Sequence, residues 1–139
     1  MNQIYFAGAI SGGRHDQQIY EMIVSILREF GFVRTEHVAD ASITTEGESH
    51  QPAEIHDRDI EWLRDSNVVV AEVSSPSLGV GYELGRAVAW EKRVLALFRS
   101  GGDRKLSPMI RGNSGIVVQS YQGPDDLRSI IEAFFEIST

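Results

Sequence analysis

Glu83 is a carboxylate near the beginning of an expected helix, in the stretch SSPSLGVGYELGRAVAW at residues 74–90. The helix follows an apolar strand, NVVVAEV, and the turn SSPS, and helix N-termini in this position attract phosphates and other anions. A carboxylate beside such an anion site has two explanations. It either complements the helix dipole, which contributes roughly 0.3–1 kcal/mol, or acts on a ligand. Gly81 and Gly85 flank Glu83 and are expected to leave space around it.

Asp59 is the acidic member of an otherwise apolar stripe on a helix expected at about residues 53–65. Ile55, Trp62 and Leu63 share its face, while charged residues occupy the opposite face. Burial among apolar side chains disfavours the ionised form of a carboxyl group, which suits a proton donor. The alternative is an Asp bonded to a backbone amide or to an arginine, and the helix alone leaves both interpretations open.

The first turn, GAISGGR at residues 8–14, is rich in glycine and can offer backbone N–H groups to an anion. It has neither the G-x-G-x-x-G spacing nor the Lys-Ser/Thr pair of a P-loop, so it can equally be a tight strand-to-helix turn. The histidines, His15, His37, His50 and His56, include two in HQPAEIHDRD, but their spacing matches no standard zinc site. We therefore expect no metal and no cofactor.

The elements that position these residues alternate between strand and helix. Strands are expected at residues 4–9, 32–38, 67–73, 93–98 and 115–120. Helices are expected where Ile19, Ile23, Ile26, Leu27 and Phe30 recur, with Gly31 as the stop, and at 53–65, 79–92 and 124–137. Residues 39–52 have no periodicity and form a long polar loop, typical of a functional or mobile segment.

This alternation predicts an α/β fold, of the single-domain Rossmann or flavodoxin-like three-layer type, with a parallel sheet of about five strands. Ligands bind such sheets beyond the carboxyl ends of the strands. That rule selects four segments: GAISGGR, the region of Glu36 and His37, SSPSLGVGYE, and RSGGDRKLSPM.

Composition narrows the classes of function. The chain of 139 residues is 42% hydrophobic, enough for one domain with a core, and it has no cysteine, which excludes disulfides, thiolate catalysis and cysteine-based zinc sites. The net charge of −7 argues against a nucleic-acid partner, although small anions remain possible ligands. No targeting segment and no apolar stretch of transmembrane length is visible, so we expect no membrane partner and a cytoplasmic or nuclear location.

Several stretches closely resemble the 2′-deoxynucleoside 5′-phosphate N-hydrolases, members of the wider nucleoside 2-deoxyribosyltransferase superfamily. They are YFAGAISGGR, TEHV, DIEWLRDSNVVVAEVSSPSLGVGYELGRAVA, RVLALFRS and LSPMIRG. The resemblance covers most of the chain in the same order and is weakest at residues 39–54 and in the last helix. It implies hydrolysis of the bond between base and sugar in deoxynucleoside 5′-monophosphates.

The resemblance also implies roles. Glu83 is the nucleophile that attacks C1′, Tyr5 hydrogen-bonds and orients it, and Asp59 protonates or holds the departing base. Ser77 binds the 5′-phosphate, and Ser107 completes the site of the neighbouring subunit in a homodimer. Further substrate contacts are implied at Gly8, Ile10, Ser11, Gly12, Gly13, Arg14, His37, Gly79 and Met109. From the residues alone, Ser107 before Pro108 fits the N-cap of a short helix equally well.

One departure from the family pattern concerns the first turn. Vertebrate members read Arg-Gly-Gly-Arg where this chain has Ser11 in the first of these positions. Three alternatives therefore stand beside the hydrolase: a nucleoside deoxyribosyltransferase, a ribonucleoside 5′-monophosphate hydrolase, and a non-enzymatic nucleotide-binding module. The implied phosphate contacts favour the hydrolase over the transferase, and a receiver-like module would need an acidic cluster after the first strand, which GAISGG lacks.

Overall fold

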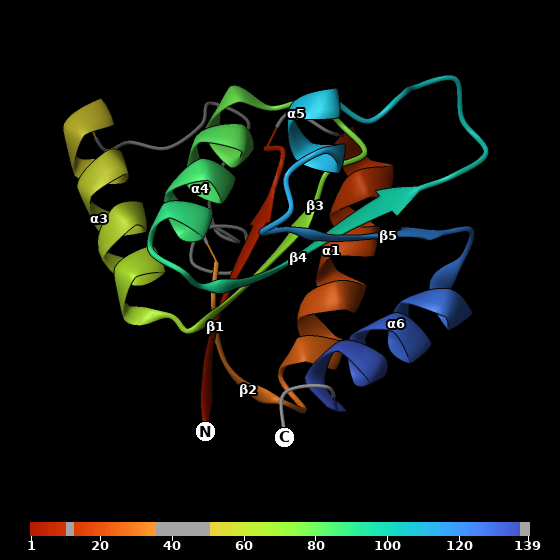
Figure 1. The fold of residues 1–139 in the computed structure, drawn as a ribbon, viewed down its shortest axis with the longest axis horizontal. Coiled ribbons are helices and arrows are strands. Elements are labelled where there is room, and N and C mark those ends of the chain that lie inside the picture. Colours follow the sequence, from red (N-terminus) through yellow and green to blue (C-terminus); the bar gives the residue numbers. More distant parts are fainter. Residues whose placement is uncertain (11–12, 36–50, 137–139) are drawn as a thin grey trace.

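The computed structural model describes residues 1–10, 13–35 and 51–136, and within them the centre is a five-stranded parallel sheet in the order β2-β1-β3-β4-β5 (Figure 1). The strands are β1 (Asn2–Gly8), β2 (Gly31–Arg34), β3 (Val68–Glu72), β4 (Arg93–Arg99) and β5 (Val117–Tyr121). The helices are α1 (Gly13–Leu27), α3 (Pro52–Asp65), α4 (Leu78–Ala89), α5 (Pro108–Arg111) and α6 (Pro124–Glu136). The predicted α/β fold with a parallel sheet is confirmed.

Helices cover both faces of the sheet. Figure 1 shows α1 and α6 on one side and α3 and α4 on the other. Successive strand residues point to opposite faces. In β1, Ile4 and Phe6 therefore join the core under α1 and α6, whereas Tyr5 and Ala7 join the core under α3 and α4. The face that holds α3 and α4 is the one on which Asp59 and Glu83 were expected.

The central strands β1 and β3 are apolar because both of their faces are covered. Every residue of β3 is buried, as expected for a strand inside a parallel sheet. In the register of the pair, Tyr5 lies beside Val69 and Gly8 lies beside Glu72. Their carboxyl ends therefore meet at one edge, where the turn between β3 and α4 also begins.

Gly31 has a different role from the predicted one. It was expected to end the first helix, but α1 already ends at Leu27 and Gly31 begins β2. A Cβ at Gly31 would lie 2.3 Å from the backbone oxygen of Asn2, so the close approach of β2 to β1 requires glycine. The second strand, expected at residues 32–38, ends at Arg34, and residues 36–38 lie outside the described part of the chain. None of the described helices is both long and apolar enough to cross a membrane.

Candidate active site

Glu83 lies in the second turn of α4 and faces the interior. The helix begins at Leu78 because Ser77 caps it: the Ser77 Oγ accepts a hydrogen bond from the Val80 N–H at 3.2 Å. The Glu83 side chain is only 8% exposed. Tyr5, on the central strand β1 and 1% exposed, donates its hydroxyl hydrogen bond to Oε2 of Glu83. The middle of the sheet thus fixes the direction of this carboxyl group.

The environment of Glu83 shifts its ionisation toward neutral pH. Burial raises the pKa of Glu83 from 4.5 to about 7, because a carboxylate loses its hydration inside the protein. The hydrogen bond from Tyr5 acts in the opposite direction and lowers the pKa, while the negative charge of Asp59 raises it. A group that titrates near neutral pH suits either nucleophilic or acid–base chemistry.

Asp59 is buried on α3, as the apolar stripe predicted, and it has an arginine partner. The Nε of Arg58 lies 3.0 Å from Oδ1 of Asp59, and the Arg58 guanidinium stacks over the ring of Trp62 at 4.8 Å. The arginine interpretation of Asp59 is therefore correct as far as it goes. It does not exclude a functional role, because Asp59 also lines a cavity with Glu83.

The cavity between α3 and α4 has a volume of about 480 Å³ and holds two of the three predicted catalytic residues. Its lining is mostly apolar apart from the carboxyl groups, which suits a flat base with a few polar contacts. It also includes two of the predicted substrate contacts. The described lining residues are Ile10, Pro52, Ile55, His56, Asp59, Ile60, Gly79, Tyr82 and Glu83.

Tyr82 and His56 are lining residues that the sequence did not single out for this site. The His56 Nε2 lies 2.9 Å from the Tyr82 hydroxyl, and the His56 Nδ1 lies 2.9 Å from Oδ1 of Asp57. Arg86 donates to the same hydroxyl at 2.8 Å. The pair joins α3 to α4 beside the two carboxyl groups. The signal for Tyr82 was present in the sequence, because it lies three residues after Gly79 and thus on the same side of the helix.

Ser77 and Ser107 line a different cavity, of about 390 Å³, formed by the turn before α4 and the loop before α5. Ser107 caps α5, since its Oγ accepts a hydrogen bond from the Met109 N–H at 3.2 Å. The N-cap interpretation of Ser107 is therefore correct within one chain. A role for Ser107 in a neighbouring subunit stays a prediction.

The glycines next to Glu83 do not leave space around its carboxyl group. Gly81 and Gly85 are two residues away in each direction, and residues two apart in a helix project to nearly opposite sides. Both glycines are exposed, and a Cβ on either would meet nothing within 4 Å. The glycine on the side of Glu83 is Gly79, which lines the same cavity.

A model of the nucleoside 2-deoxyribosyltransferase family matches residues 4–127. The chain belongs to this family. The match contains both α3 and α4 and therefore the whole described lining of the cavity with Glu83. The predicted resemblance is confirmed.

Relatives within the nucleoside 2-deoxyribosyltransferase family share about half of their residues with this chain. A Danio rerio protein named 5-hydroxymethyl-dUMP N-hydrolase is 51% identical over 140 residues, covering 98% of this chain and 97% of its own length. The Homo sapiens protein of the same name is 51% identical over 138 residues, covering 96% and 79%. A Trichoplax adhaerens protein named putative 2′-deoxynucleoside 5′-phosphate N-hydrolase 1 is 49% identical, covering 96% and 93%.

Solved structures show the same fold at low identity. A CMP N-glycosidase from Clostridium botulinum superposes with a TM-score of 0.66 at 17% identity, covering 94% of this chain and 98% of that one. A 2-deoxyribosyltransferase from Bacillus psychrosaccharolyticus gives a TM-score of 0.69 at 14% identity, covering 90% and 89%. The fold of the family is thus built on widely different sequences.

The remaining predicted substrate contacts of this family member lie in several places. Ile10 lines the cavity with Glu83, and Met109 lines the cavity with Ser107. Gly8 is needed for packing, because a Cβ there would come within 2.9 Å of the Tyr20 ring. Gly13 is the first residue of α1 and Arg14 is the second. Ser11, Gly12 and His37 lie outside the described residues.

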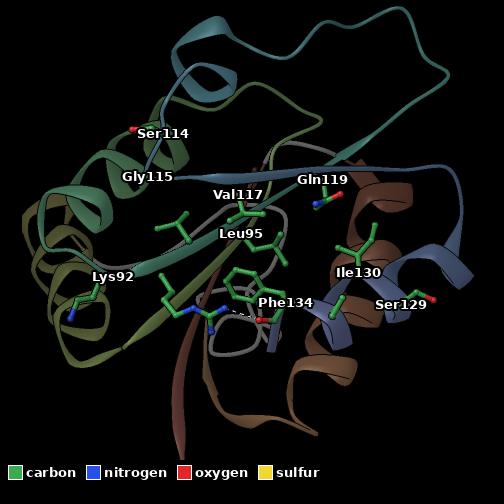
Figure 2. A pocket seen from close by; sticks show the side chains of 12 residues that line it. Lys92, Leu95, Ser114, Gly115, Val117, Gln119, Ser129, Ile130 and Phe134 are labelled. Carbon is green, nitrogen blue, oxygen red and sulfur yellow. Dashed lines mark hydrogen bonds between the residues drawn. The ribbon is translucent and has the colours of Figure 1, made fainter. Parts of the chain in front are cut away.

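Two other features do not belong to the candidate site. A hollow of about 590 Å³ lies between β5 and α6 (Figure 2). Arg93, one of its two cations, is occupied by Phe134, donating to the backbone oxygen at 2.7 Å and stacking over the ring at 4.1 Å. Within residues 1–10, 13–35 and 51–136, no group of three His, Asp or Glu side chains is arranged to hold a metal ion, and His37 and His50 lie outside these ranges.

Proposed function

We propose that this protein hydrolyses the N-glycosidic bond of 2′-deoxynucleoside 5′-monophosphates, releasing the free base and 2-deoxyribose 5-phosphate. The observation that carries the proposal is the buried Glu83 carboxyl, oriented by Tyr5, which opens with Asp59 onto one largely apolar cavity. The names of relatives with about half of their residues in common support the same reaction.

The geometry supports a two-step reaction. The Glu83 carboxylate forms a bond to C1′ while the bond from C1′ to the base breaks, and the base leaves with the bonding electrons and takes up a proton. Water then displaces the carboxylate and releases the sugar phosphate. The negative charge of Glu83 also stabilises the cationic character that develops at C1′. A deoxy sugar suits this route, since no electron-withdrawing 2′-hydroxyl opposes that charge.

Asp59 is proposed to act on the base. It faces the cavity beside Glu83, where it can protonate or hold the departing base. The apolar lining, including Ile55 and Ile60, suits the flat faces of a pyrimidine or purine. Because relatives are named for 5-hydroxymethyl-dUMP, we take that nucleotide as the substrate to test first.

The phosphate is proposed to bind at the N-terminus of α4. Backbone N–H groups at the start of a helix are free to bind anions, and the helix dipole adds to the attraction. Gly79 lies in this first turn, and a Cβ there would meet only the Ser77 Oγ, at 3.8 Å, so a ligand can approach the backbone closely. Glu83 lies one turn further along, so the two ends of a nucleotide reach different turns of one helix.

A homodimer is part of the proposal. The outer side of α4 supports it: Leu78 is 96% exposed, and Met109 at the neighbouring cavity is 80% exposed. Gly81 and Gly85 lie on the same outer side with open space around them, so another surface can approach the helix closely. Exposed apolar side chains grouped in this way are typical of a protein interface. A second copy there would bring its own Ser107 to the phosphate.

The test is a substrate panel with release of free base as the readout. The panel contains 5-hydroxymethyl-dUMP, dUMP and CMP, together with the three corresponding nucleosides, and Glu83→Ala is the control for contaminating activity. We expect base release from the deoxynucleoside monophosphates and far less from the nucleosides, because the remote phosphate positions C1′ against Glu83. Adding a free second base separates hydrolysis from transfer. Equal use of nucleoside and nucleotide, or base exchange in place of sugar phosphate release, would make the protein a transferase.

A further inference from the structure

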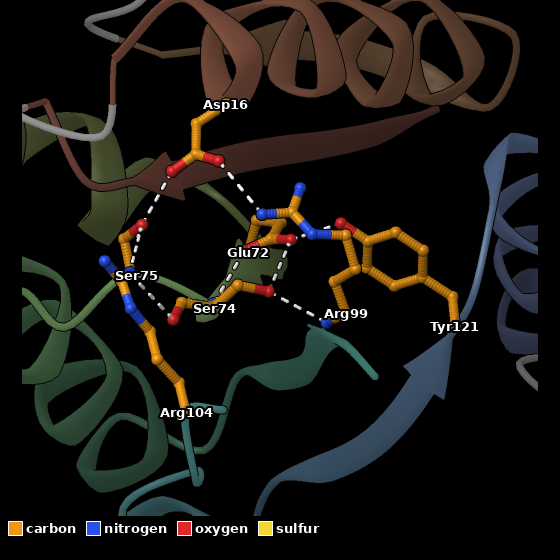
Figure 3. A network of polar contacts seen from close by, with 7 residues as sticks. All are labelled: Asp16, Glu72, Ser74, Ser75, Arg99, Arg104 and Tyr121. Carbon is orange, nitrogen blue, oxygen red and sulfur yellow. Dashed lines mark hydrogen bonds and ion pairs between the residues drawn. The ribbon is translucent and has the colours of Figure 1, made fainter. Parts of the chain in front are cut away.

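A second buried carboxyl group, Glu72, lies at the carboxyl end of β3, on the face of the sheet away from Glu83. It is 2% exposed and is the last residue of a strand that is otherwise entirely apolar. Figure 3 shows it at the centre of a polar network that joins the carboxyl ends of three neighbouring strands to α1. The proposed mechanism makes no use of this group.

Glu72 accepts hydrogen bonds on both of its oxygens. Its Oε1 accepts from the backbone N–H of Ser74 at 2.7 Å. Its Oε2 accepts from the Ser74 hydroxyl at 2.9 Å and from the Tyr121 hydroxyl on β5. The Ser74 Oγ in turn accepts from the backbone N–H of Arg99 on β4, at 2.8 Å. Burial, and then the bond to Glu72, raises the pKa of Tyr121 well above its ordinary value, so the hydroxyl keeps its proton and remains a donor.

The next residue of the turn, Ser75, is held from two sides. Its hydroxyl donates to Oδ2 of Asp16 on α1 at 2.6 Å, and Asp16 is paired with Arg99 at 3.2 Å. Arg104, in the loop before α5, donates to the Ser75 Oγ at 2.9 Å and to the Ser74 carbonyl at 3.4 Å. Both residues at the start of the turn are thus fixed by side chains from distant parts of the chain.

The turn fixed in this way is the one that leads into α4. Ser77 follows Ser75 after a single proline and caps the helix, and all three serines of the turn line the cavity of about 390 Å³. A shift of the turn would move the Ser77 hydroxyl and the first N–H groups of α4. Glu83 is attached separately, through Tyr5 on β1. The two ends of the proposed site therefore have separate anchors.

We propose that Glu72, with Tyr121 and Ser74, is a positioning group for phosphate recognition: it fixes the turn from Val73 to Ser77 so that the α4 N-terminus meets the 5′-phosphate of the substrate. This inference rests on the proposed function. It predicts that loss of the network weakens the use of the phosphate and leaves the chemistry at Glu83 intact. A purely structural role would instead lower all activity in parallel with stability.

The principal variant is Tyr121→Phe, which removes one hydroxyl and keeps the ring. We expect KM for 5-hydroxymethyl-dUMP to rise roughly 5- to 10-fold, as for the loss of one buried hydrogen bond, with kcat nearly unchanged. Residual kcat/KM for the unphosphorylated deoxynucleoside should not change, so the preference for the phosphate falls by the same factor. Ser74→Ala should act in the same direction, and Ser74→Thr, which keeps a hydroxyl, should restore the preference.

The matched control is Ile131→Val, which removes a methyl group from the same core as Tyr121 without touching the network. An equal loss for nucleotide and nucleoside in Tyr121→Phe, or the same kinetic pattern in Ile131→Val, would overturn the inference. If Tyr121→Phe does not fold, the Ser74 pair decides. The dissociation constant for dUMP, measured by calorimetry, keeps the two proposals apart. A chain that binds dUMP without cleaving any substrate refutes hydrolysis, while the ratio of dissociation constants still decides the role of Glu72.

Discussion

The hydroxyl of Tyr5 sets the pH range in which Glu83 is reactive, and Tyr5→Phe measures that effect. The hydroxyl donates to Oε2 of Glu83 and opposes the rise in the carboxyl pKa that burial causes. A hydrogen bond to a charged group contributes about 1.5–3 kcal/mol, and one pKa unit corresponds to about 1.36 kcal/mol. Removal of the hydroxyl should therefore raise the Glu83 pKa from about 7 by roughly 1–2 units.

The expected result is a displaced pH profile. With a pKa of about 7, about half of the Glu83 side chains are ionised at neutral pH. In Tyr5→Phe the ionised fraction falls to roughly 1–10%, so kcat/KM at neutral pH should fall roughly 5- to 50-fold. Activity should recover as the pH rises through the new pKa, because the carboxylate is then restored.

The assay is kcat/KM for 5-hydroxymethyl-dUMP from about pH 5 to about pH 9, a range that brackets both pKa values. Tyr121→Phe is the matched control, since it removes the same group from a tyrosine that donates to Glu72 instead of Glu83. Its acid limb should coincide with that of the wild type. Coincident acid limbs for Tyr5→Phe and the wild type would show that Glu83 is not the titrating group, or that the Tyr5 hydroxyl does not act on it.

Three further outcomes follow from the same residues. Glu83→Gln should keep the fold and lose several orders of magnitude in turnover, so a variant with a tenth of the wild-type rate would remove Glu83 from the nucleophile role. The rise of the Glu83 pKa from 4.5 to about 7 corresponds to a penalty of about 3 kcal/mol against the ionised form. Because a raised carboxyl pKa destabilises the fold above that pKa and costs nothing below the unfolded value, Glu83→Gln should melt several degrees higher than the wild type near pH 8. That gap should close as the pH approaches 4.5, and a gap independent of pH would refute the assigned shift. Finally, Ser107→Ala and Glu83→Ala chains, once subunit exchange has been verified with two tags, should recover activity on mixing, whereas sites built within single chains would give no rescue.

The fold and the main carboxyl groups could be predicted because their signals are local. Apolar runs and helical spacing revealed the strand and helix order, and the rule for parallel sheets placed Glu83 at the ligand edge. The apolar stripe on α3 also predicted that Asp59 is buried, which the structure confirms. The roles assigned to these residues through family resemblance stay predictions.

The misinterpretations arise where distant contacts decide. Gly31 has the composition of a helix stop, but its glycine is required by a backbone oxygen of Asn2 on the neighbouring strand. Gly81 and Gly85 are close to Glu83 in sequence but project to the other side of α4. Glu72 passed as the end of an apolar strand, because its partner Tyr121 is 49 residues away.

Glu72 and Glu83 show why one carboxyl group of this chain can react and the other cannot. In the described part of the chain, Glu72 accepts three hydrogen bonds spread over both oxygens, and it lies inside the network of Figure 3. Glu83 receives a side-chain hydrogen bond from Tyr5 on Oε2 and lines an open cavity. Hydrogen bonds to the charged form stabilise it and reduce its tendency to attack, whereas burial with few donors leaves a carboxylate poorly solvated and reactive. Both groups lie near the carboxyl ends of central strands, so position in the fold does not distinguish them. The number of donors around each carboxyl group does, and it assigns covalent chemistry to Glu83 and positioning to Glu72.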